Sequence, residues 1–257
     1  MFPRYLLVPT LLALGLLAGC GTMNRDDWSA ERYYEEARQA MEAERYQTAL
    51  EYYQELESNY PYGRYAEQAQ LDMAYVYYRS NQPQSAIDTA ERFIEMHPRH
   101  PQVDYAYYLR GLAAYGQNRS FLNDLFNQSP DERDPQGARD AFRHFADLVR
   151  EYPDSDYAGD AIQRMIHLRN SLGRYEVHVA QYYLDREAWV AAADRARYVV
   201  ENYDRTPAVA EALAIMGQAY VRLGETDLAR DALSVLRANH PEHAGIEELE
   251  RALEGDS

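Results

Sequence analysis

The chain has 257 residues and a formal net charge of −16, because 42 acidic residues face 26 basic ones, all of which are arginine. Such an acidic balance argues against nucleic acid as a partner and against adhesion to an anionic membrane by charge alone, since no basic stripe exists to neutralise phosphates. Tyrosine supplies 24 of the aromatic residues. The acidic, lysine-free composition fits either codon bias or adaptation to salt.

The N-terminal segment is typical of a bacterial export signal. Arg4 precedes the apolar run Tyr5–Ala18, which is too short for a membrane span of about 20 residues. Small residues lead directly to Cys20, the only cysteine in the chain. The pattern resembles the bacterial lipobox, which implies that residues 1–19 are a signal peptide and that Cys20 carries a covalent lipid. Gly21 stands where an Asp would retain a lipoprotein in the inner membrane, which implies the periplasmic face of the outer membrane. The alternative for Cys20 is an incidental thiol.

Beyond a lipidated tether of residues 20–28, the chain repeats one pattern of small and apolar residues. We expect residues 29–257 to form an all-α fold, an α-solenoid of five TPR-like helix pairs in a right-handed superhelix. Ser29 is the expected N-cap of the first helix, and Pro83 is expected at the first position of the fourth. The predicted repeats span about residues 30–63, 67–100, 103–153, 157–204 and 210–243.

The third predicted repeat contains an insertion. The interval Gly111–Ala141 covers 30 positions, where the TPR template has about 12. The extra segment, residues 118–136, contains the apolar pairs Phe121-Leu122 and Leu125-Phe126. We therefore expect the insertion to pack, either on its own solenoid or on a partner. Asp134-Pro135 is expected to restart the helix as N-cap and first position.

The fourth repeat is predicted to contain one unusually long helix over Tyr157–Arg186, with a possible bend or hinge at Gly173. The fifth repeat, Ala210–His243, fits the template best. Here the small residues Gly217 and Ala229 are expected to let the two helices of the pair approach closely. The final segment, Ala244–Ser257, is expected either to cap the stack or to fray.

Nothing in the sequence predicts catalysis, a metal or a cofactor other than the lipid. The spacings His97–His100 and His240–His243 would suit a metal ion. Both pairs, however, fall in the turn after a second helix, where a histidine interacts favourably with the C-terminal end of the helix dipole. We therefore predict no metal site and no catalytic residues.

Adjacent tyrosines recur along the predicted helices. Neighbouring helical residues point about 100° apart, so one ring of each pair is expected to enter the core while the other faces a groove. Such a groove would suit an extended peptide. The alternative is a core aromatic residue with a half-exposed neighbour. The pairs are Tyr33-Tyr34, Tyr52-Tyr53, Tyr77-Tyr78, Tyr107-Tyr108 and Tyr182-Tyr183.

Three strings go beyond the general TPR pattern: Asn59–Tyr78 (NYPYGRYAEQAQLDMAYVYY), Asp134–Tyr152 (DPQGARDAFRHFADLVREY) and Tyr175–Asp204 (YEVHVAQYYLDREAWVAAADRARYVVENYD). Together with the lipobox and the five repeats, they resemble the BamD (ComL) family, the TPR lipoproteins of the outer-membrane β-barrel assembly machine. The resemblance implies a non-enzymatic scaffold that docks to the periplasmic domain of BamA, joins other Bam lipoproteins and receives unfolded outer-membrane protein precursors.

The resemblance also implies site residues. Arg195 is the expected contact to an acidic residue of BamA, with Arg186 as a second candidate. Without the resemblance, Arg195 would be one more arginine on a helix surface. The N-terminal repeats offer Tyr46, Tyr60, Tyr62 and Gly63 for a precursor peptide. The alternative function is a cell-envelope TPR adaptor that serves peptidoglycan enzymes or polysaccharide export.

Overall fold

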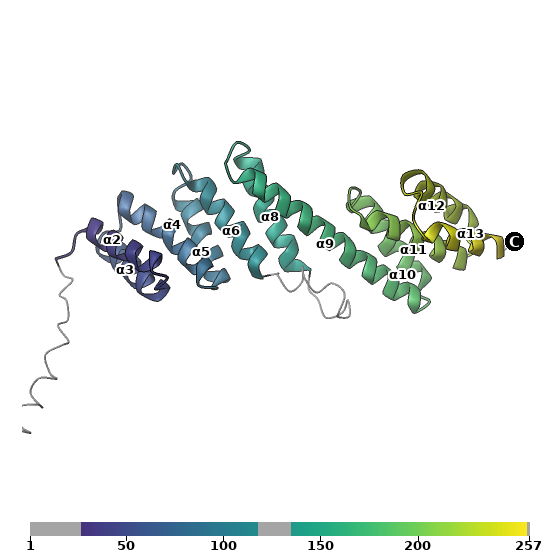
Figure 1. Ribbon diagram of the computed structural model, residues 1–257, viewed down its shortest axis with the longest axis horizontal. Helices are drawn as coiled ribbons and strands as arrows, with labels where there is room; N and C mark the ends of the chain where they lie inside the picture. The colour runs from purple at the N-terminus through teal and green to yellow at the C-terminus, as the bar shows by residue number, and fades with distance from the viewer. Residues whose placement is uncertain (1–26, 118–134, 256–257) are drawn as a thin grey trace, which may run out of the picture.

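The computed structural model describes residues 27–117 and 135–255, and in these ranges every regular element is an α-helix. Figure 1 shows the helices in an elongated row that runs from one end of the chain to the other. The predicted all-α solenoid of helix pairs is confirmed for these ranges. The predicted signal segment, Cys20, Asp134 and most of the insertion lie outside them. The helices are α2 (Ala30–Glu42), α3 (Tyr46–Asn59), α4 (Arg64–Arg79), α5 (Pro83–Met96), α6 (Val103–Gln117), α8 (Gln136–Glu151), α9 (Ala158–Asp185), α10 (Trp189–Asn202), α11 (Ala208–Arg222), α12 (Thr226–Asn239) and α13 (Gly245–Gly255).

The helices pack in sequence as α2–α3, α4–α5, α6–α8, α9–α10 and α11–α12. The first helices of some neighbouring pairs also contact one another: α2 contacts α4, α4 contacts α6, and α9 contacts α11. Between neighbouring pairs the main packing is of the second helix against the next first helix: α3 against α4, α5 against α6, α8 against α9 and α10 against α11. Each repeat is therefore stabilised chiefly by its neighbours. Small residues make the close packing possible, and alanines such as Ala37, Ala86 and Ala192 are completely buried.

The turn inside a pair has the same backbone geometry in four repeats. Glu44, Asn81, Glu187 and Gly224 all have positive φ angles, between 56° and 76°. The next residue in each case donates its backbone N–H to the carbonyl oxygen five positions earlier. This is the Schellman arrangement, which satisfies carbonyl groups at the end of the first helix. The shared turn confirms that the sequence repeat is a structural repeat.

Helix starts agree with the sequence at two positions and differ at one. The Ser29 hydroxyl accepts a hydrogen bond from the backbone N–H of Arg32 at 3.3 Å, and Pro83 occupies the first turn of α5. Pro135 was predicted to be the first residue of its helix, and this was wrong by one position. Its carbonyl oxygen accepts the first helical hydrogen bond, from the N–H of Arg139, so Pro135 is the N-cap of α8.

The C-terminal segment forms α13, which packs against α11 and α12. Leu249 of α13 is completely buried, so the segment caps the stack. This helix also explains Gly217, for which our prediction was wrong. A Cβ atom at Gly217 would lie 2.3 Å from Leu249 Cδ2, so the glycine makes room for α13 and not for the paired helix α12. In the third repeat, the paired helices approach closely at Gly111, because a Cβ there would meet the ring of Phe145 on α8 at 2.5 Å.

The long helix α9 spans 28 residues and is continuous through Gly173. A Cβ atom at Gly173 would lie 3.2 Å from Ala208 Cβ, at the start of α11. The middle of α9 therefore packs closely against the next repeat, and α9 also contacts α8 and α10. One predicted boundary needs correction, because Trp28, which we placed in the tether, is buried against Tyr33 and Tyr52. In the described ranges, no helix has both the length and the apolar character that crossing a bilayer requires.

Candidate functional site

A buried carboxylate joins three helices in the middle of the solenoid. Glu176 lies on α9, and its side chain is only 1% exposed. Its Oε1 atom accepts a hydrogen bond from Arg139 Nη2 on α8 at 3.0 Å, and its Oε2 atom accepts one from Arg195 Nη1 on α10 at 2.8 Å. Among the described residues, Glu176 is the only charged side chain in the buried core. We call these three residues the charge triad.

Helical spacing explains why a carboxylate is buried here. Leu172, Glu176 and Ala180 follow one another at intervals of four, so they share one face of α9. Leu172 and Ala180 are buried in the core that α9 forms with its neighbours, and Glu176 is enclosed between them. An unpaired carboxylate at this place would cost several kcal/mol in lost hydration, which two charge-assisted hydrogen bonds offset. The triad therefore requires both arginines to stay in place.

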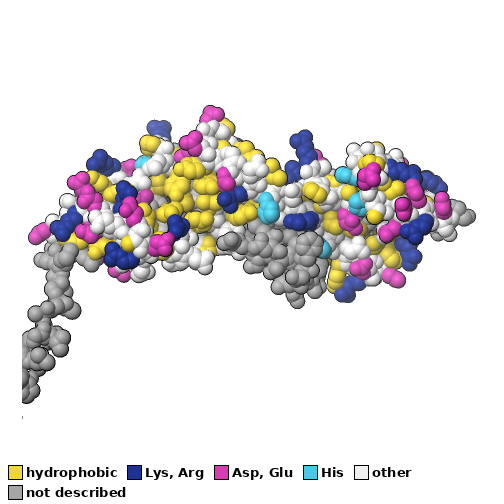
Figure 2. Space-filling model, in the orientation of Figure 1, with side chains coloured by type: hydrophobic (Ala, Val, Ile, Leu, Met, Phe, Trp, Pro, Cys, Tyr) yellow, Lys and Arg dark blue, Asp and Glu magenta, His cyan; other side chains and the backbone are white. Residues whose placement is uncertain are grey.

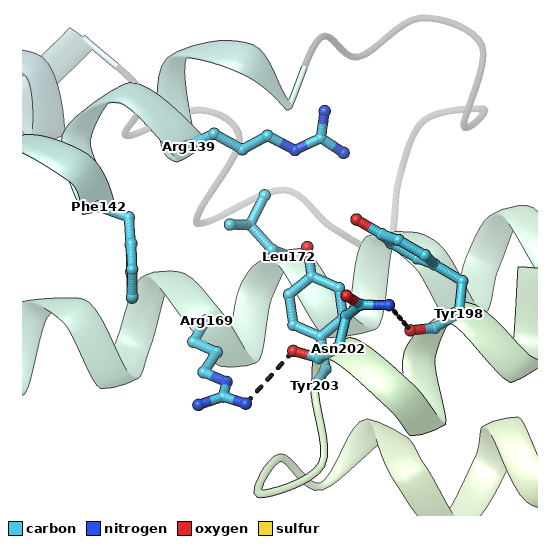
Figure 3. Close-up of a pocket in the computed structure, with 7 residues that line it drawn as sticks. All are labelled: Arg139, Phe142, Arg169, Leu172, Tyr198, Asn202 and Tyr203. Carbon is cyan, nitrogen blue, oxygen red and sulfur yellow. Dashed lines mark hydrogen bonds between the residues drawn. The ribbon is translucent and has the colours of Figure 1, made fainter.

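A cavity of about 420 Å³ lies beside the triad. Figure 3 shows Arg139 on one side of it and Arg169 on the other, with Leu172 and the ring of Tyr203 between them. Arg169 donates to the backbone oxygen of Asn202 at 3.3 Å and forms an ion pair with Asp204. The lining thus combines two guanidinium groups with apolar and phenolic surface. The lining residues are Arg139, Phe142, Arg169, Leu172, Tyr198, Asn202 and Tyr203.

Tyr203 connects this cavity to the triad electrostatically. Burial is the main cause that raises the pKa of the Tyr203 hydroxyl, followed by the nearby Tyr198 and by the Glu176 charge. Arg139 acts in the opposite direction, because a positive charge favours the phenolate. The net effect keeps Tyr203 protonated, so it serves as a neutral hydrogen-bonding group in the cavity wall.

The structure distinguishes Arg195 from the other arginines on its helix, which the sequence alone did not. Among the described residues, the ion pair of Arg197, two positions further on, is with Asp194 on the same helix, and both side chains are about half exposed. Arg195 instead reaches Glu176, which lies 19 positions earlier in the chain. Arg186 is not part of the triad. It is the C-cap of α9, and its guanidinium lies 4.0 Å from the centre of the Tyr182 ring.

The four residues predicted for a precursor peptide lie at the two ends of α3. Tyr60, Tyr62 and Gly63 lie in the turn between α3 and α4, where Tyr62 is 92% exposed and the Tyr60 hydroxyl donates to the Trp28 carbonyl oxygen at 2.7 Å. Tyr46 is the first residue of α3, at the other end of that 14-residue helix. About 20 Å of helix separates it from the turn. A peptide that contacted all four residues would therefore have to run along the length of α3.

The prediction for paired tyrosines holds in the first repeat only. Tyr33 and Tyr53 are buried while Tyr34 and Tyr52 are half-buried, but both rings are half-buried in the other three pairs. Tyr34 and Tyr53 both donate hydrogen bonds to Asp72 Oδ2 on α4, at 2.9 and 3.1 Å. Here the hydroxyls connect the first repeat to the second.

The histidines at the repeat ends have local partners. His97 Nε2 lies 3.1 Å from Gln70 Oε1, and His243 Nε2 lies 3.3 Å from Glu211 Oε2. Each ring thus contacts the first helix of its own repeat. Over residues 27–117 and 135–255, no three His, Cys, Asp or Glu side chains are arranged to hold a metal ion.

Charged side chains of both signs cover the visible face along its whole length (Figure 2). A hydrophobic area, in which tyrosine is included, lies over the region of α4 to α6. The basic groups are dispersed among acidic ones, in keeping with the net charge of −16. Against this background, a buried acid that holds two arginines is a distinct local feature.

Comparison with known proteins identifies relatives over nearly the whole chain. The family model of YfiO, described as an outer membrane lipoprotein, matches residues 26–236. The outer membrane protein assembly factor BamD of Neisseria meningitidis is 44% identical over 90% of this chain and 88% of its own length. The BamD proteins of Neisseria gonorrhoeae and Vibrio cholerae are 43% and 38% identical, over 90% and 92% of this chain and 88% and 99% of their own lengths.

Proposed function

This chain belongs to the YfiO family of outer membrane lipoproteins, which includes the BamD assembly factors, and from that premise we propose that it assists the assembly of outer-membrane proteins. It acts as a scaffold without catalytic activity of its own. The observation that carries the proposal is the extent of the match, since relatives named as assembly factors align with about nine-tenths of the chain. The helix-pair solenoid supports it, because stacked repeats present an extended surface to other proteins.

The partner of the C-terminal half is the periplasmic domain of BamA, which docks at Arg195 with Arg186 near the edge of the contact. The charge triad supports this assignment. Glu176 holds the Arg195 guanidinium in one place while 39% of the Arg195 side chain stays exposed. A partner carboxylate therefore meets an arginine that has already lost most of its conformational freedom, which lowers the entropic cost of binding.

The N-terminal repeats receive unfolded precursors, and other lipoproteins of the machine join the complex elsewhere. The turn between α3 and α4 supports the first assignment, because Tyr62 is almost fully exposed there and Gly63 has a φ angle of 102°. An exposed aromatic ring next to a backbone turn suits contact with an extended apolar chain. A lipid on Cys20 holds the protein to the periplasmic face of the outer membrane.

Affinity purification from detergent-solubilised membranes of the native organism tests the proposal. The tagged full-length protein is expected to recover BamA, and Arg195→Gln is expected to reduce that recovery at least tenfold, given about 2–5 kcal/mol for removing one member of a buried charge contact. Arg197→Gln is the matched control, because Arg197 lies on the same helix and pairs with Asp194. Cys20→Ser is expected to release the protein from membranes and to abolish palmitate labelling.

Recovery of peptidoglycan enzymes or polysaccharide-export proteins without BamA would favour the alternative, an envelope adaptor. Equal loss with Arg195→Gln and Arg197→Gln would remove the specific role of Arg195 but leave the scaffold function. Labelling that persists in Cys20→Ser would refute the lipid anchor at that residue.

A further inference from the structure

The charge triad contains one more positive charge than negative. One carboxylate, that of Glu176, faces two guanidinium groups, those of Arg139 and Arg195. In the part of the chain that the structure describes, the ion pairs of both arginines are with Glu176. The carboxylate is 1% exposed, whereas the two arginine side chains are 42% and 39% exposed. The excess positive charge therefore faces the solvent on a protein whose net charge is −16.

The geometry places the two guanidinium groups as a pair. They bind the two oxygen atoms of one carboxylate, so they are separated by no more than the width of that group and two hydrogen bonds. A guanidinium carries five N–H donors in a planar fork, and the bond to Glu176 leaves others available to a second acceptor. A carboxylate that approaches from the solvent can thus contact both arginines at once.

We propose that Arg139 is a second docking residue for an acidic side chain of the partner, and that buried Glu176 is the positioning residue that holds Arg139 and Arg195 as a pair. This inference rests on the proposed docking to BamA and extends it from one arginine to two. Arg139 lies on α8 in the third repeat and Arg195 on α10 in the fourth, so the paired site spans two repeats. The cavity adjoins this site on the side of Arg139, which lines it.

The site selects its partner by charge. A carboxylate gains a short-range attraction from two guanidinium groups, while the acidic remainder of the surface repels an acidic partner elsewhere. A cationic partner side chain would meet repulsion from the same pair. The pair therefore specifies an Asp or Glu as the partner residue and fixes the position at which it docks.

Binding of the full-length protein, purified in detergent, to the BamA periplasmic domain of the same organism tests this inference. Arg139→Gln is expected to weaken binding at least tenfold and to make the affinity less sensitive to NaCl, because one of two attracting charges is lost. Arg143→Gln is the matched control, since Arg143 lies on the same helix, is 64% exposed and pairs with Asp140. The control is expected to bind as the wild type does, with an unchanged salt dependence.

Glu176→Gln separates positioning from simple charge. The change makes the site more positive, so a charge effect alone would strengthen binding to an acidic partner. If Glu176 holds the pair in place, binding is instead expected to weaken about tenfold. Near-ultraviolet circular dichroism and thermal unfolding report whether each variant keeps its fold, and the salt series of Arg139→Gln decides the matter if Glu176→Gln does not fold.

Two results would overturn the inference while leaving the proposed function in place. In the first, Arg139→Gln binds as Arg143→Gln does, although Arg195→Gln binds weakly. In the second, folded Glu176→Gln binds as tightly as the wild type or more tightly. Failure of the wild-type protein to bind the BamA domain at all would instead contradict the proposed docking, and the inference with it.

Discussion

His144 lies on α8, near the guanidinium groups of Arg110 and Arg143. Its Nδ1 atom is buried and has no hydrogen-bond partner among the described residues. Burial is the main cause that lowers the pKa of His144 to about 4 from its usual 6.5, and the two arginines add to the effect. The imidazole is therefore neutral in the folded protein at physiological pH.

This shift predicts a specific sensitivity to acid. Because the folded state has the lower pKa, the unfolded state binds a proton first as the pH falls, and stability is lost from about pH 6.5 down to about pH 4. Across this window His144→Gln is expected to lose about 1 kcal/mol less than the wild type, a value below the unscreened shift because solvent reaches part of the ring. Urea unfolding of both proteins at the two ends of the window measures the difference. Parallel losses in the two proteins would show that His144 does not contribute.

At the residue scale, the sequence named single residues but not the contacts that they make. Arg195 was selected by a resemblance, but its partner Glu176 was not, because the two lie on different helices and only the packing of α9 against α10 brings them together. Arg139 was missed for the same reason. A signal for Glu176 did exist, since it occupies a position between Leu172 and Ala180 that would otherwise be apolar. The sequence also did not show that Tyr46 and the residues Tyr60, Tyr62 and Gly63 lie at opposite ends of α3.

Among the elements, α9 and α13 show what helical patterns can and cannot predict. The sequence predicted the length of α9 closely, because apolar spacing continues without a breaker, and the structure ends it at Asp185. For the segment that forms α13, the sequence did not decide between a cap on the stack and a frayed end. A short amphipathic segment is helical only if it packs on a surface. That surface is formed by α11 and α12. The sequence alone does not reveal that these two helices leave an apolar surface for α13 to cover.

The packing of α13 gives a test at Gly217. Gly217→Ala would place a methyl group 2.3 Å from Leu249 Cδ2, which costs about 1–3 kcal/mol in overpacking. Alanine gains about 1 kcal/mol over glycine in a helix, so the free energy of unfolding is expected to fall by up to about 2 kcal/mol. Gly116→Ala is the control, because no atom lies within 4 Å of a Cβ at Gly116 on α6, and alanine favours a helix more than glycine does. Guanidinium unfolding compares the midpoints. Equal or higher stability in Gly217→Ala would contradict the close contact between α11 and α13.

At the scale of the whole molecule, the row of repeats explains why the fold was the easiest part to predict. The repeats share small residues at corresponding positions, and four of the five share the same turn, so the pattern occurs several times along one chain. That common pattern did not indicate the function. The function was indicated by the strings that go beyond the common pattern, such as Tyr175–Asp204, which contains both Glu176 and Arg195. The insertion and the lipid anchor remain predictions of the sequence.

The central claim is that this protein assists the assembly of β-barrel proteins in the outer membrane. Depletion of the protein in its native organism, followed by measurement of heat-modifiable β-barrel proteins in the outer membrane, tests the claim most directly. We predict that the folded barrels decline as the protein is lost, and that expression of the wild type restores them. Unchanged barrel levels, with altered peptidoglycan or surface polysaccharide, would contradict the claim.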